Sequence, residues 1–195
     1  YLPEYDTPIR NSKAVAVVGG GNVAMDAARC AKRMGAEHVY IVYRRSEKEM
    51  PARLEEVHHA KEEGIEFHLL ENPVQILNDG NGQVCGIECL KMELGEPDAS
   101  GRRSPVAIPG VTETIDIDLA IVSVGVSPNP IVPSSIKGLE LGRKGTIAVN
   151  DNMQSSIPTI YAGGDIVRGG ATVILAMGDG RRAAAAMHAQ LTQQK

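Results

Sequence analysis

The chain has 195 residues, of which 43% are hydrophobic and 23% are charged, so it is long and apolar enough for one globular domain or slightly more. The net charge of −4 and the aromatic content of 3% argue against nucleic acid as a partner, because they offer neither a basic surface nor a stacking platform. No apolar run approaches the roughly 20 residues of a membrane span and no secretory hydrophobic region opens the chain, so we expect a cytoplasmic protein that does not enter a membrane.

Residues 1–11 include Pro3 and Pro8 and show no periodic pattern, which is typical of a linker. The chain begins with Tyr1 rather than methionine. We therefore expect it to be part of a longer protein.

The segment from 14 to 24 predicts a strand followed by a dinucleotide-binding turn. Ala14–Val18 is an apolar run too short for a helix, which is typical of a parallel strand buried on both faces. The sequence Gly-Gly-Gly-Asn-Val-Ala then matches the G-x-G-x-x-G/A fingerprint. In this pattern Gly19 allows a tight turn, Gly21 lets the backbone approach a pyrophosphate, and Ala24 permits close packing of helix on strand. The phosphates are expected at the N-terminus of the next helix, whose unpaired N–H groups and dipole favour negative charge.

The residues after the second strand indicate which nicotinamide cofactor is bound. A helix is predicted over Asn22–Met34, with Gly35 as its C-terminal cap, and a strand over Val39–Tyr43. An NAD-binding protein has Asp or Glu after this strand to bind the ribose 2′-hydroxyl, whereas here Arg44 and Arg45 follow it. Two guanidinium groups suit a 2′-phosphate, so the predicted cofactor is NADP(H). A glycine-rich stretch can also be only a turn, but the strand, the helix and the basic pair are separate requirements that are all met.

The following segments continue the alternation of strand and helix and then change character. A helix is predicted over Ala52–Glu63, after a break at Pro51, and a strand over Ile65–Leu70. Two further strands flank an Asn-Asp-Gly-Asn-Gly hairpin sequence, and a third follows a loop at 95–104. They predict a small antiparallel meander made of Val74–Leu77, Val84–Glu93 and Glu113–Ile117.

Asp118–Gly125 is predicted to be another buried strand of the parallel sheet. Ligands of such sheets lie beyond the carboxyl ends of the strands, which places Gly125 near the nicotinamide half of the cofactor. An ordinary turn at the end of a strand explains the same glycine equally well.

Residues 131–195 have a different pattern. Short strands are predicted over Thr146–Val149 and Thr159–Ala162, and the second ends in Gly-Gly-Asp. The carboxylate of Asp165 is suited to accept hydrogen bonds from a sugar-like hydroxyl, although a simple turn residue is the alternative. An alanine-rich helix is predicted over Thr172–Leu191, and its N-terminal N–H groups could face the electron-rich edge of a flavin ring.

No metal site is predicted. Cys30, Cys85 and Cys89 have neither a C-x-x-C pair nor a zinc or iron–sulfur spacing, and we interpret them as buried or half-buried free thiols. His58 and His59 are adjacent, so on a helix their side chains point about 100° apart rather than toward one ion.

Two separated stretches resemble the small (beta) subunit of NADPH-dependent glutamate synthase, VVGGGNVAMDAARCAKRMGAEHVYIVYRRSEKEMPARLEE and TIYAGGDIVRGGATVILAMGDGRRAAAAMHAQL. They are also similar to the NADPH-binding halves of dihydropyrimidine dehydrogenase and of NADH-dependent ferredoxin-NADP reductase. DLAIVSVGVSPNP, between the two stretches, shares the resemblance.

The resemblance implies a fold and a set of contacts. It implies an α/β chain in which an NADP(H)-binding, Rossmann-like domain with a small antiparallel meander, 12–130, precedes the C-terminal segment of a discontinuous FAD-binding domain, 131–195. The implied NADPH contacts are Gly20, Gly21, Asn22 and Val23 for the pyrophosphate, Arg44 and Arg45 for the 2′-phosphate, and Gly125 on the nicotinamide side. The implied FAD contacts are Gly164 and Asp165 at the ribityl and phosphate region and Thr172 and Val173 at the flavin edge.

The sequence also departs from the family pattern. The FAD fingerprint and the iron–sulfur cysteines that lie upstream in the family are missing here, so we expect a C-terminal portion that retains NADPH binding more readily than FAD binding. The redox C-x-x-C of thioredoxin reductases is missing too. We therefore expect hydride to pass from NADPH to FAD and electrons to pass onward to a partner, with no side chain acting as a catalytic acid or base.

Three functions fit the sequence. The first is the small subunit of glutamate synthase, with the large subunit or another iron–sulfur protein as its partner. The second is another electron-transfer subunit, of the NAD(P)H:ferredoxin or dihydropyrimidine dehydrogenase type. The third is a nucleotide-binding module without catalytic activity.

Overall fold

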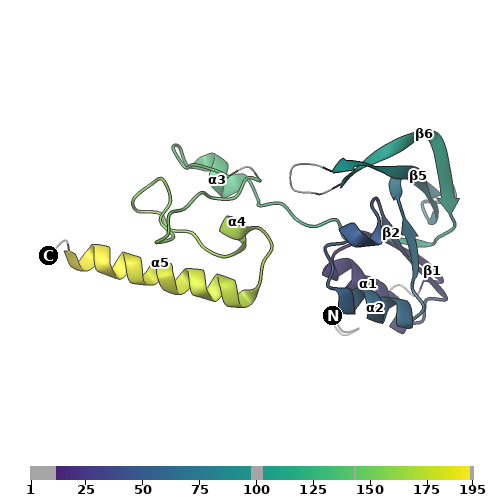
Figure 1. Ribbon diagram of the computed structural model, residues 1–195, viewed down its shortest axis with the longest axis horizontal. Helices are drawn as coiled ribbons and strands as arrows, with labels where there is room; N and C mark the ends of the chain where they lie inside the picture. The colour runs from purple at the N-terminus through teal and green to yellow at the C-terminus, as the bar shows by residue number, and fades with distance from the viewer. Residues whose placement is uncertain (1–11, 98–102, 143, 194–195) are drawn as a thin grey trace. The chain divides into compact units, whose positions relative to one another are not determined.

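The computed structural model describes residues 12–97, 103–142 and 144–193 (Figure 1). The chain divides into two compact units, of which the first ends at Gly125 and the second begins at Val126. The predicted linker, 1–11, lies outside the described residues. Within the described ranges, no helix is both long and apolar enough to cross a bilayer.

A parallel sheet forms the centre of the first unit. It has four strands in the order β3-β2-β1-β7. The middle strand β1 pairs with β2 and β7 on its two sides, and Val15, Ala16 and Val17 are buried, as the apolar run predicted. The strands are β1 (Ala14–Val18), β2 (His38–Tyr43), β3 (Glu66–Leu69) and β7 (Leu119–Val122).

Two helices, α1 (Asn22–Arg33) and α2 (Leu54–Glu62), pack on one face of this sheet. A short 3₁₀ helix, Glu47–Glu49, lies in the segment that connects β2 to α2. α2 begins later than the predicted residue Ala52, because Arg53 has the extended backbone of an N-cap residue, with φ −64° and ψ 144°. The N–H of Ala52 donates to Gly20 O at 3.1 Å. The connection is therefore tied to the glycine turn.

The other face of the parallel sheet is covered by an antiparallel sheet of three strands in the order β4-β5-β6. Ile87 and Cys89 of this sheet are buried against Ala16 and Val42 of the parallel sheet. The bounds are β4 (Glu71–Asn78), β5 (Val84–Pro97) and β6 (Arg103–Ile115).

The meander is confirmed, but its third strand differs from the prediction. β6 begins at Arg103, whereas the sequence predicted a loop up to 104 and a strand over Glu113–Ile117. β6 is an edge strand, and an edge strand tolerates residues such as Pro105 and Pro109, which have no N–H to donate. Part of the predicted loop, 98–102, lies outside the described residues.

The second unit contains the helices α3 (Ile131–Ser135), α4 (Asp165–Arg168) and α5 (Val173–Gln193). The predicted strands Thr146–Val149 and Thr159–Ala162 are not strands in the structure. Their extended residues form only isolated antiparallel bridges, such as Val149 to Ser155 and Gln154 to Tyr161, because the described part of the unit supplies no neighbouring strand to complete a sheet.

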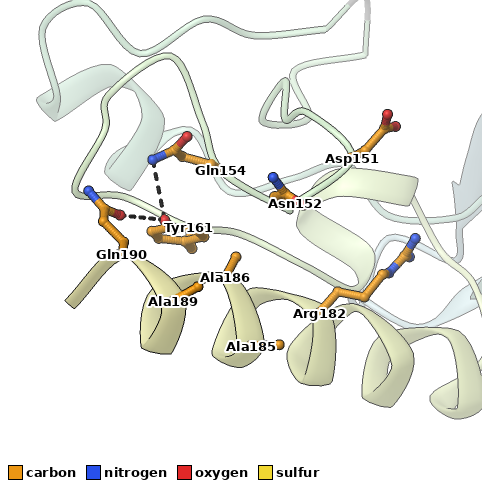
Figure 2. Close-up of a pocket in the computed structure, with 9 residues that line it drawn as sticks. All are labelled: Asp151, Asn152, Gln154, Tyr161, Arg182, Ala185, Ala186, Ala189 and Gln190. Atoms are coloured by element: carbon orange, nitrogen blue, oxygen red, sulfur yellow. Dashed lines mark hydrogen bonds between the residues drawn. The ribbon is translucent and has the colours of Figure 1, made fainter. Parts of the chain in front are cut away.

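A polar pocket of about 610 Å³ lies between α5 and the loop around 151–161 (Figure 2). The hydroxyl of Tyr161 donates to Gln190 Oε1 at 2.6 Å and accepts from Gln154 Nε2 at 3.2 Å. These groups satisfy one another within the pocket wall. None of the residues predicted to contact a cofactor lines this pocket.

Candidate functional site: the glycine turn and its surroundings

Gly19 fits its position because no larger residue does. Its φ is +144°, and a Cβ atom there would lie 2.3 Å from Ser123 O and 3.3 Å from Ala24 Cβ. The N–H of Gly19 donates to Val42 O at 3.0 Å. The turn is thus held close to the ends of β2 and β7, as expected for the first glycine of the fingerprint.

The next two glycines have different surroundings. A Cβ on Gly20 would lie 2.7 Å from ring atoms of Tyr43, whose hydroxyl donates to Glu49 O at 2.8 Å. A Cβ on Gly21 would meet only Pro51 Cγ, at 3.9 Å. One side of the turn is therefore closed by Tyr43, and the backbone of Gly21 faces open space that a ligand can approach.

α1 starts directly after Gly21 and offers unpaired N–H groups. The first-turn N–H groups of Asn22 and Val23 have no acceptor within the helix, and no acidic residue occupies this turn. The helix dipole adds positive potential at the same point. The turn and the helix end therefore fit a pyrophosphate.

The side chain of Asn22 has a structural contact that the sequence did not reveal. Asn22 Oδ1 accepts a hydrogen bond from the N–H of Arg53 at 2.9 Å. The backbone N–H of Asn22 stays available to a ligand, while its carboxamide oxygen holds the start of α2. Arg53 was not predicted as a site residue, because only this contact between distant segments places it here.

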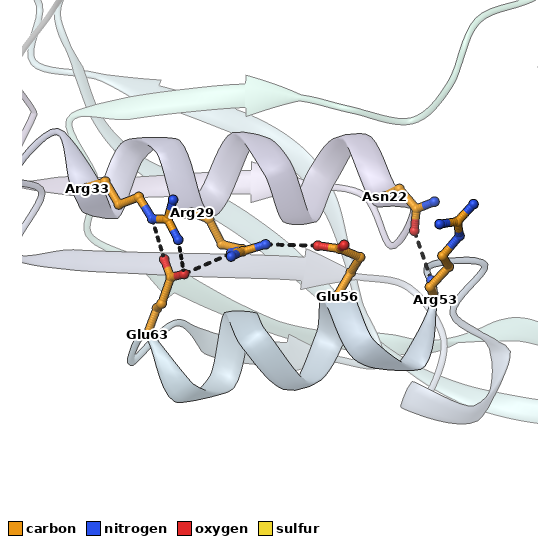
Figure 3. A network of polar contacts seen from close by, with 6 residues as sticks. All are labelled: Asn22, Arg29, Arg33, Arg53, Glu56 and Glu63. Carbon is orange, nitrogen blue, oxygen red and sulfur yellow. Dashed lines mark hydrogen bonds and ion pairs between the residues drawn. The ribbon is translucent and has the colours of Figure 1, made fainter. Parts of the chain in front are cut away.

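A network of ion pairs fixes α2 alongside α1 (Figure 3). Arg29 contacts Glu56 at 2.9 Å and Glu63 at 3.0 Å, and Arg33 contacts Glu63 at 2.6 Å. The hydrogen bond from Arg33 is the main reason that the pKa of Glu63 lies below its usual value. The network joins the first turn of α2, through Glu56, and its C-terminal end, through Glu63, to α1. The contact between Asn22 and Arg53 holds the residue that precedes α2.

Arg44 and Arg45 follow β2, as predicted. Arg44 is exposed and Arg45 is half-buried. The Nε atom of Arg45 is buried and has no hydrogen-bond partner among the described residues. The N–H of Leu70 donates to Arg45 O at 3.2 Å and ties this residue to the end of β3. Because an unpaired buried donor is costly, an anionic acceptor such as a 2′-phosphate fits this position.

Gly125 lies just beyond β7, near the same edge of the sheet. The N–H of Ser123 donates to Val18 O at 2.7 Å, next to the glycine turn. Gly125 has a φ of +91°, and a Cβ atom added there would meet nothing within 4 Å. This geometry requires glycine for the turn itself and leaves the space beside it open.

The four predicted flavin contacts lie close together in the second unit. Asp165 Oδ1 accepts from the N–H of Ala171 at 3.2 Å, just before α5. Thr172 Oγ1 accepts from the N–H of Leu175 at 3.4 Å, and Val173 is 75% exposed. Gly164, with φ +73°, would place a Cβ 3.3 Å from that of Ala176 on α5.

A buried carboxylate, which the sequence analysis missed, organises this second cluster. Asp179 is fully buried and accepts hydrogen bonds from Gly164 N at 3.0 Å, from Arg168 at 2.6 Å through two nitrogens, and from Arg182 at 2.5 Å. The bonds from Arg168 are the main reason that the pKa of Asp179 lies well below its usual value. The N–H of Gly164 is thereby used within the protein, so Asp165 is the part of the turn that a ligand can contact.

A second charged cluster lies between β3 and the antiparallel sheet. The side chains of His68, Glu71 and Glu113 bring nitrogen and oxygen atoms within 4.8 Å of one another. Lys91 Nζ lies 2.7 Å from Glu71 Oε1 and also contacts Glu113, which lowers the pKa of Glu113. The ammonium group of Lys91 thus compensates part of the negative charge of Glu71 and Glu113.

The three cysteines are free thiols, as predicted, but two are more exposed than expected. Cys30 and Cys85 are exposed, and Cys89 is buried. Burial raises the pKa of the Cys89 thiol to about 12.

Comparison with known proteins identifies the family of the chain. The family model described as pyridine nucleotide-disulphide oxidoreductase matches residues 3–186. The chain belongs to this family. Its name agrees with the nucleotide-binding turn, and the α/β fold predicted from the sequence is confirmed.

Curated relatives in this family include two NADP-dependent enzymes. The beta subunit of NADP(+)-dependent formate dehydrogenase from Moorella thermoacetica is 44% identical, over 95% of this chain and 26% of the relative. The small chain of NADPH glutamate synthase from Escherichia coli K12 is 42% identical, over 88% of this chain and 37% of the relative. The resemblance to glutamate synthase small subunits is confirmed. The chain spans about a quarter of the length of the first relative and little more than a third of the second.

Among solved structures, thioredoxin reductase from T. acidophilum has a TM-score of 0.74 and 23% identity, over 94% of this chain and 54% of that one. At this identity the likeness concerns the fold alone. It supports the α/β architecture of the family.

Proposed function

We propose that the chain is the NADPH-binding part of an NADPH-dependent flavoprotein oxidoreductase. The observation that carries this proposal is the buried Nε of Arg45 after β2, which has no hydrogen-bond partner within the described part of the chain. The glycine turn also has an open face at Gly21. Family membership and the NADP-dependent relatives support the same cofactor.

Each part of the turn has a separate role in this proposal. Gly19 and Gly20 shape the turn, and the backbone of Gly21, Asn22 and Val23 holds the pyrophosphate. Arg44 and Arg45 bind the 2′-phosphate, and Gly125 lines the nicotinamide side. When bound, NADPH supplies a hydride, and the chain's own residues position it without a catalytic acid or base.

The second unit is the proposed FAD-binding segment. Asp165 would accept hydrogen bonds from the ribityl hydroxyls, and Gly164 would shape the turn beside them. Thr172 and Val173, at the exposed start of α5, would lie at the flavin edge. When bound there, FAD would supply the acceptor for the hydride.

The names of the relatives suggest which protein accepts the electrons. The first candidate is the large subunit of glutamate synthase, or another iron–sulfur partner. In this case the chain would act in the cytoplasm as part of a small subunit that serves glutamate synthesis. The second candidate is a partner of the formate dehydrogenase type, because the relative with that name is 44% identical.

Titration of the protein with nicotinamide nucleotides tests the proposal. We expect NADPH to bind more tightly than NADH by about tenfold or more, because two charged hydrogen-bonding groups meet the extra phosphate. Isothermal titration calorimetry measures both affinities, and equal affinity for the two nucleotides would contradict the predicted 2′-phosphate site.

The flavin part has its own readout in the same samples. Flavin that stays with the protein after incubation with FAD and gel filtration, and whose absorbance NADPH bleaches, would support FAD binding by the second unit. Protein that binds NADPH but retains no FAD would restrict the function of this chain to nucleotide binding.

A further inference from the structure

The start of α2 is held beside the glycine turn by backbone contacts. The N–H of Ala52 donates to Gly20 O at 3.1 Å, and the N–H of Arg53 donates to Asn22 Oδ1 at 2.9 Å. Both contacts involve residues of the nucleotide-binding turn or the first residue of α1. The backbone of Arg53 is therefore fixed at the N-terminal end of α1, whatever its side chain does.

Ion pairs from the first turn and from the C-terminal end of α2 support this placement. Glu56 and Glu63 bind Arg29 and Arg33 of α1, so α2 is attached to α1 both at its start and near its end (Figure 3). The backbone of Arg53, which immediately precedes α2, is therefore fixed relative to the N-terminal end of α1.

The guanidinium group of Arg53 has no partner among the residues that the structure describes. The side chain is exposed, and no described residue forms an ion pair or hydrogen bond with it. Figure 3 shows the side chain of Arg53 reaching past the N-terminal end of α1, alongside Asn22. The fold therefore uses the peptide N–H of Arg53 and leaves five guanidinium N–H donors at the mouth of the turn.

Arg53 stands at a different part of the site from Arg44 and Arg45. Those two residues directly follow β2, whereas Arg53 is anchored to the helix end and to the turn. Guanidinium groups bind phosphate oxygens through two parallel hydrogen bonds, and the open face of Gly21 leaves room for such a group.

We propose that Arg53 binds the pyrophosphate of the nucleotide, a role that rests on the proposed function of the turn. The pyrophosphate is common to NADP(H) and NAD(H). Arg53 thus contributes affinity without selecting between them, while Arg44 and Arg45 provide the selectivity.

The test compares the variants Arg53→Gln and Arg53→Lys with the unmodified chain, by calorimetric titration with NADP⁺ and with NAD⁺. Because only the backbone of Arg53 takes part in the fold, we expect Arg53→Gln to unfold at the same temperature as the unmodified chain. We expect it to weaken both nucleotides by the same factor, about tenfold. Arg53→Lys keeps the charge but loses the bidentate geometry, so it should recover part of the affinity.

Lys48→Gln is the matched control. Lys48 is an exposed cation in the same segment, for which no described residue forms an ion pair, and its removal changes the net charge equally. We expect this variant to bind both nucleotides within about twofold of the unmodified chain.

Three results would overturn the assignment. The first is unchanged binding of both nucleotides by Arg53→Gln. The second is a loss of affinity for NADP⁺ alone, which would show that Arg53 contacts the 2′-phosphate. The third is an equal loss of affinity in Lys48→Gln, which would indicate only a diffuse effect of charge. Failure of the unmodified chain to bind either nucleotide would instead refute the proposed function itself, and this inference with it.

Discussion

Gly19 and Gly21 are the same residue type two positions apart, but they are glycine for different reasons. Gly19 adopts a positive φ, and its missing Cβ makes room for the backbone oxygen of Ser123. Gly21 has a φ of −93°, and a Cβ atom added there would meet only Pro51 Cγ, at the ordinary contact distance of 3.9 Å. The first glycine is required by the fold, and the second leaves space for a ligand.

This difference predicts opposite results for two alanine variants. Gly19→Ala should lower the free energy of unfolding by about 3 kcal/mol, because the new Cβ meets backbone atoms and the backbone conformation is strained. Gly21→Ala should cost no more than about 1 kcal/mol, the typical effect of alanine at an N-cap, yet weaken NADPH binding by about tenfold or more. Urea unfolding and nucleotide titration measure the two effects.

The result for Gly21 is the more informative of the two. If Gly21→Ala bound NADPH as tightly as the unmodified chain, the pyrophosphate would not lie on the open face of the turn. If Gly19→Ala were as stable as the unmodified chain, the close approach to Ser123 would not be a constraint.

At the scale of single residues, the sequence allowed prediction of those candidate site residues that belong to contiguous motifs. The glycine fingerprint and the basic pair Arg44–Arg45 are contiguous motifs, so their place after β1 and β2 could be predicted. Arg53 and Asp179 could not, because each acquires its role from a partner far along the chain. Arg53 meets Asn22 across 31 positions, and Asp179 meets Gly164 across 15.

Among the elements, α4 and α5 depend most on one ionised group. Asp179 of α5 holds Arg168 of α4 and the N–H of Gly164 before it. Gly163 is also constrained, because a Cβ there would lie 2.7 Å from Asp179 Cβ. The turn that presents Asp165 is therefore built on α5 through this carboxylate.

Asp179→Ala should destabilise this arrangement in a pH-dependent manner. At pH 7 we expect the melting temperature to fall on the order of 5 °C, because two arginines and a backbone N–H lose their acceptor. The pKa of Asp179 is lowered in the folded protein, so its stabilisation is fully present above the unfolded value near 4 and is lost as the pH falls below it. The difference between variant and unmodified chain should therefore shrink toward pH 3.

Thermal unfolding followed by circular dichroism at pH 7 and at pH 3 checks this. An equal difference at both values would show that the charge of Asp179 is not what stabilises the turn. Asp179→Asn, which keeps the shape of the side chain, separates the loss of charge from the loss of packing.

The boundaries of elements could be predicted where the residues are strongly buried. The predictions were wrong where pairing with a neighbouring strand determines the boundary. β1 matches its predicted range because its apolar run is buried on both faces. β6 was misplaced because an edge strand tolerates proline, and the strands predicted around Thr146 and Thr159 lack neighbouring strands. α5 continues through Gly178 and Gly180, so its alanine-rich composition outweighed the cost of two glycines.

At the scale of the whole molecule, the chain combines a first unit, for which we propose nucleotide binding, with a second unit of different construction. The first unit has a parallel sheet covered on both faces, with the glycine turn, Arg44 and Arg45 at the ends of its strands. The second unit carries the proposed flavin contacts before and at the start of α5. We propose that the first unit distinguishes NADPH from NADH by the guanidinium groups after β2.

The most direct measurement is the affinity of the double variant Arg44→Gln with Arg45→Gln for NADPH and for NADH. We predict that NADPH binding weakens by about 1 to 3 kcal/mol for each lost charged hydrogen bond, while NADH binding stays within about twofold of the unmodified chain. The double variant Lys137→Gln with Arg181→Gln removes two exposed cations of the second unit and controls for the equal change in net charge. Equal weakening of NADPH and NADH, or no weakening of either, would contradict the account.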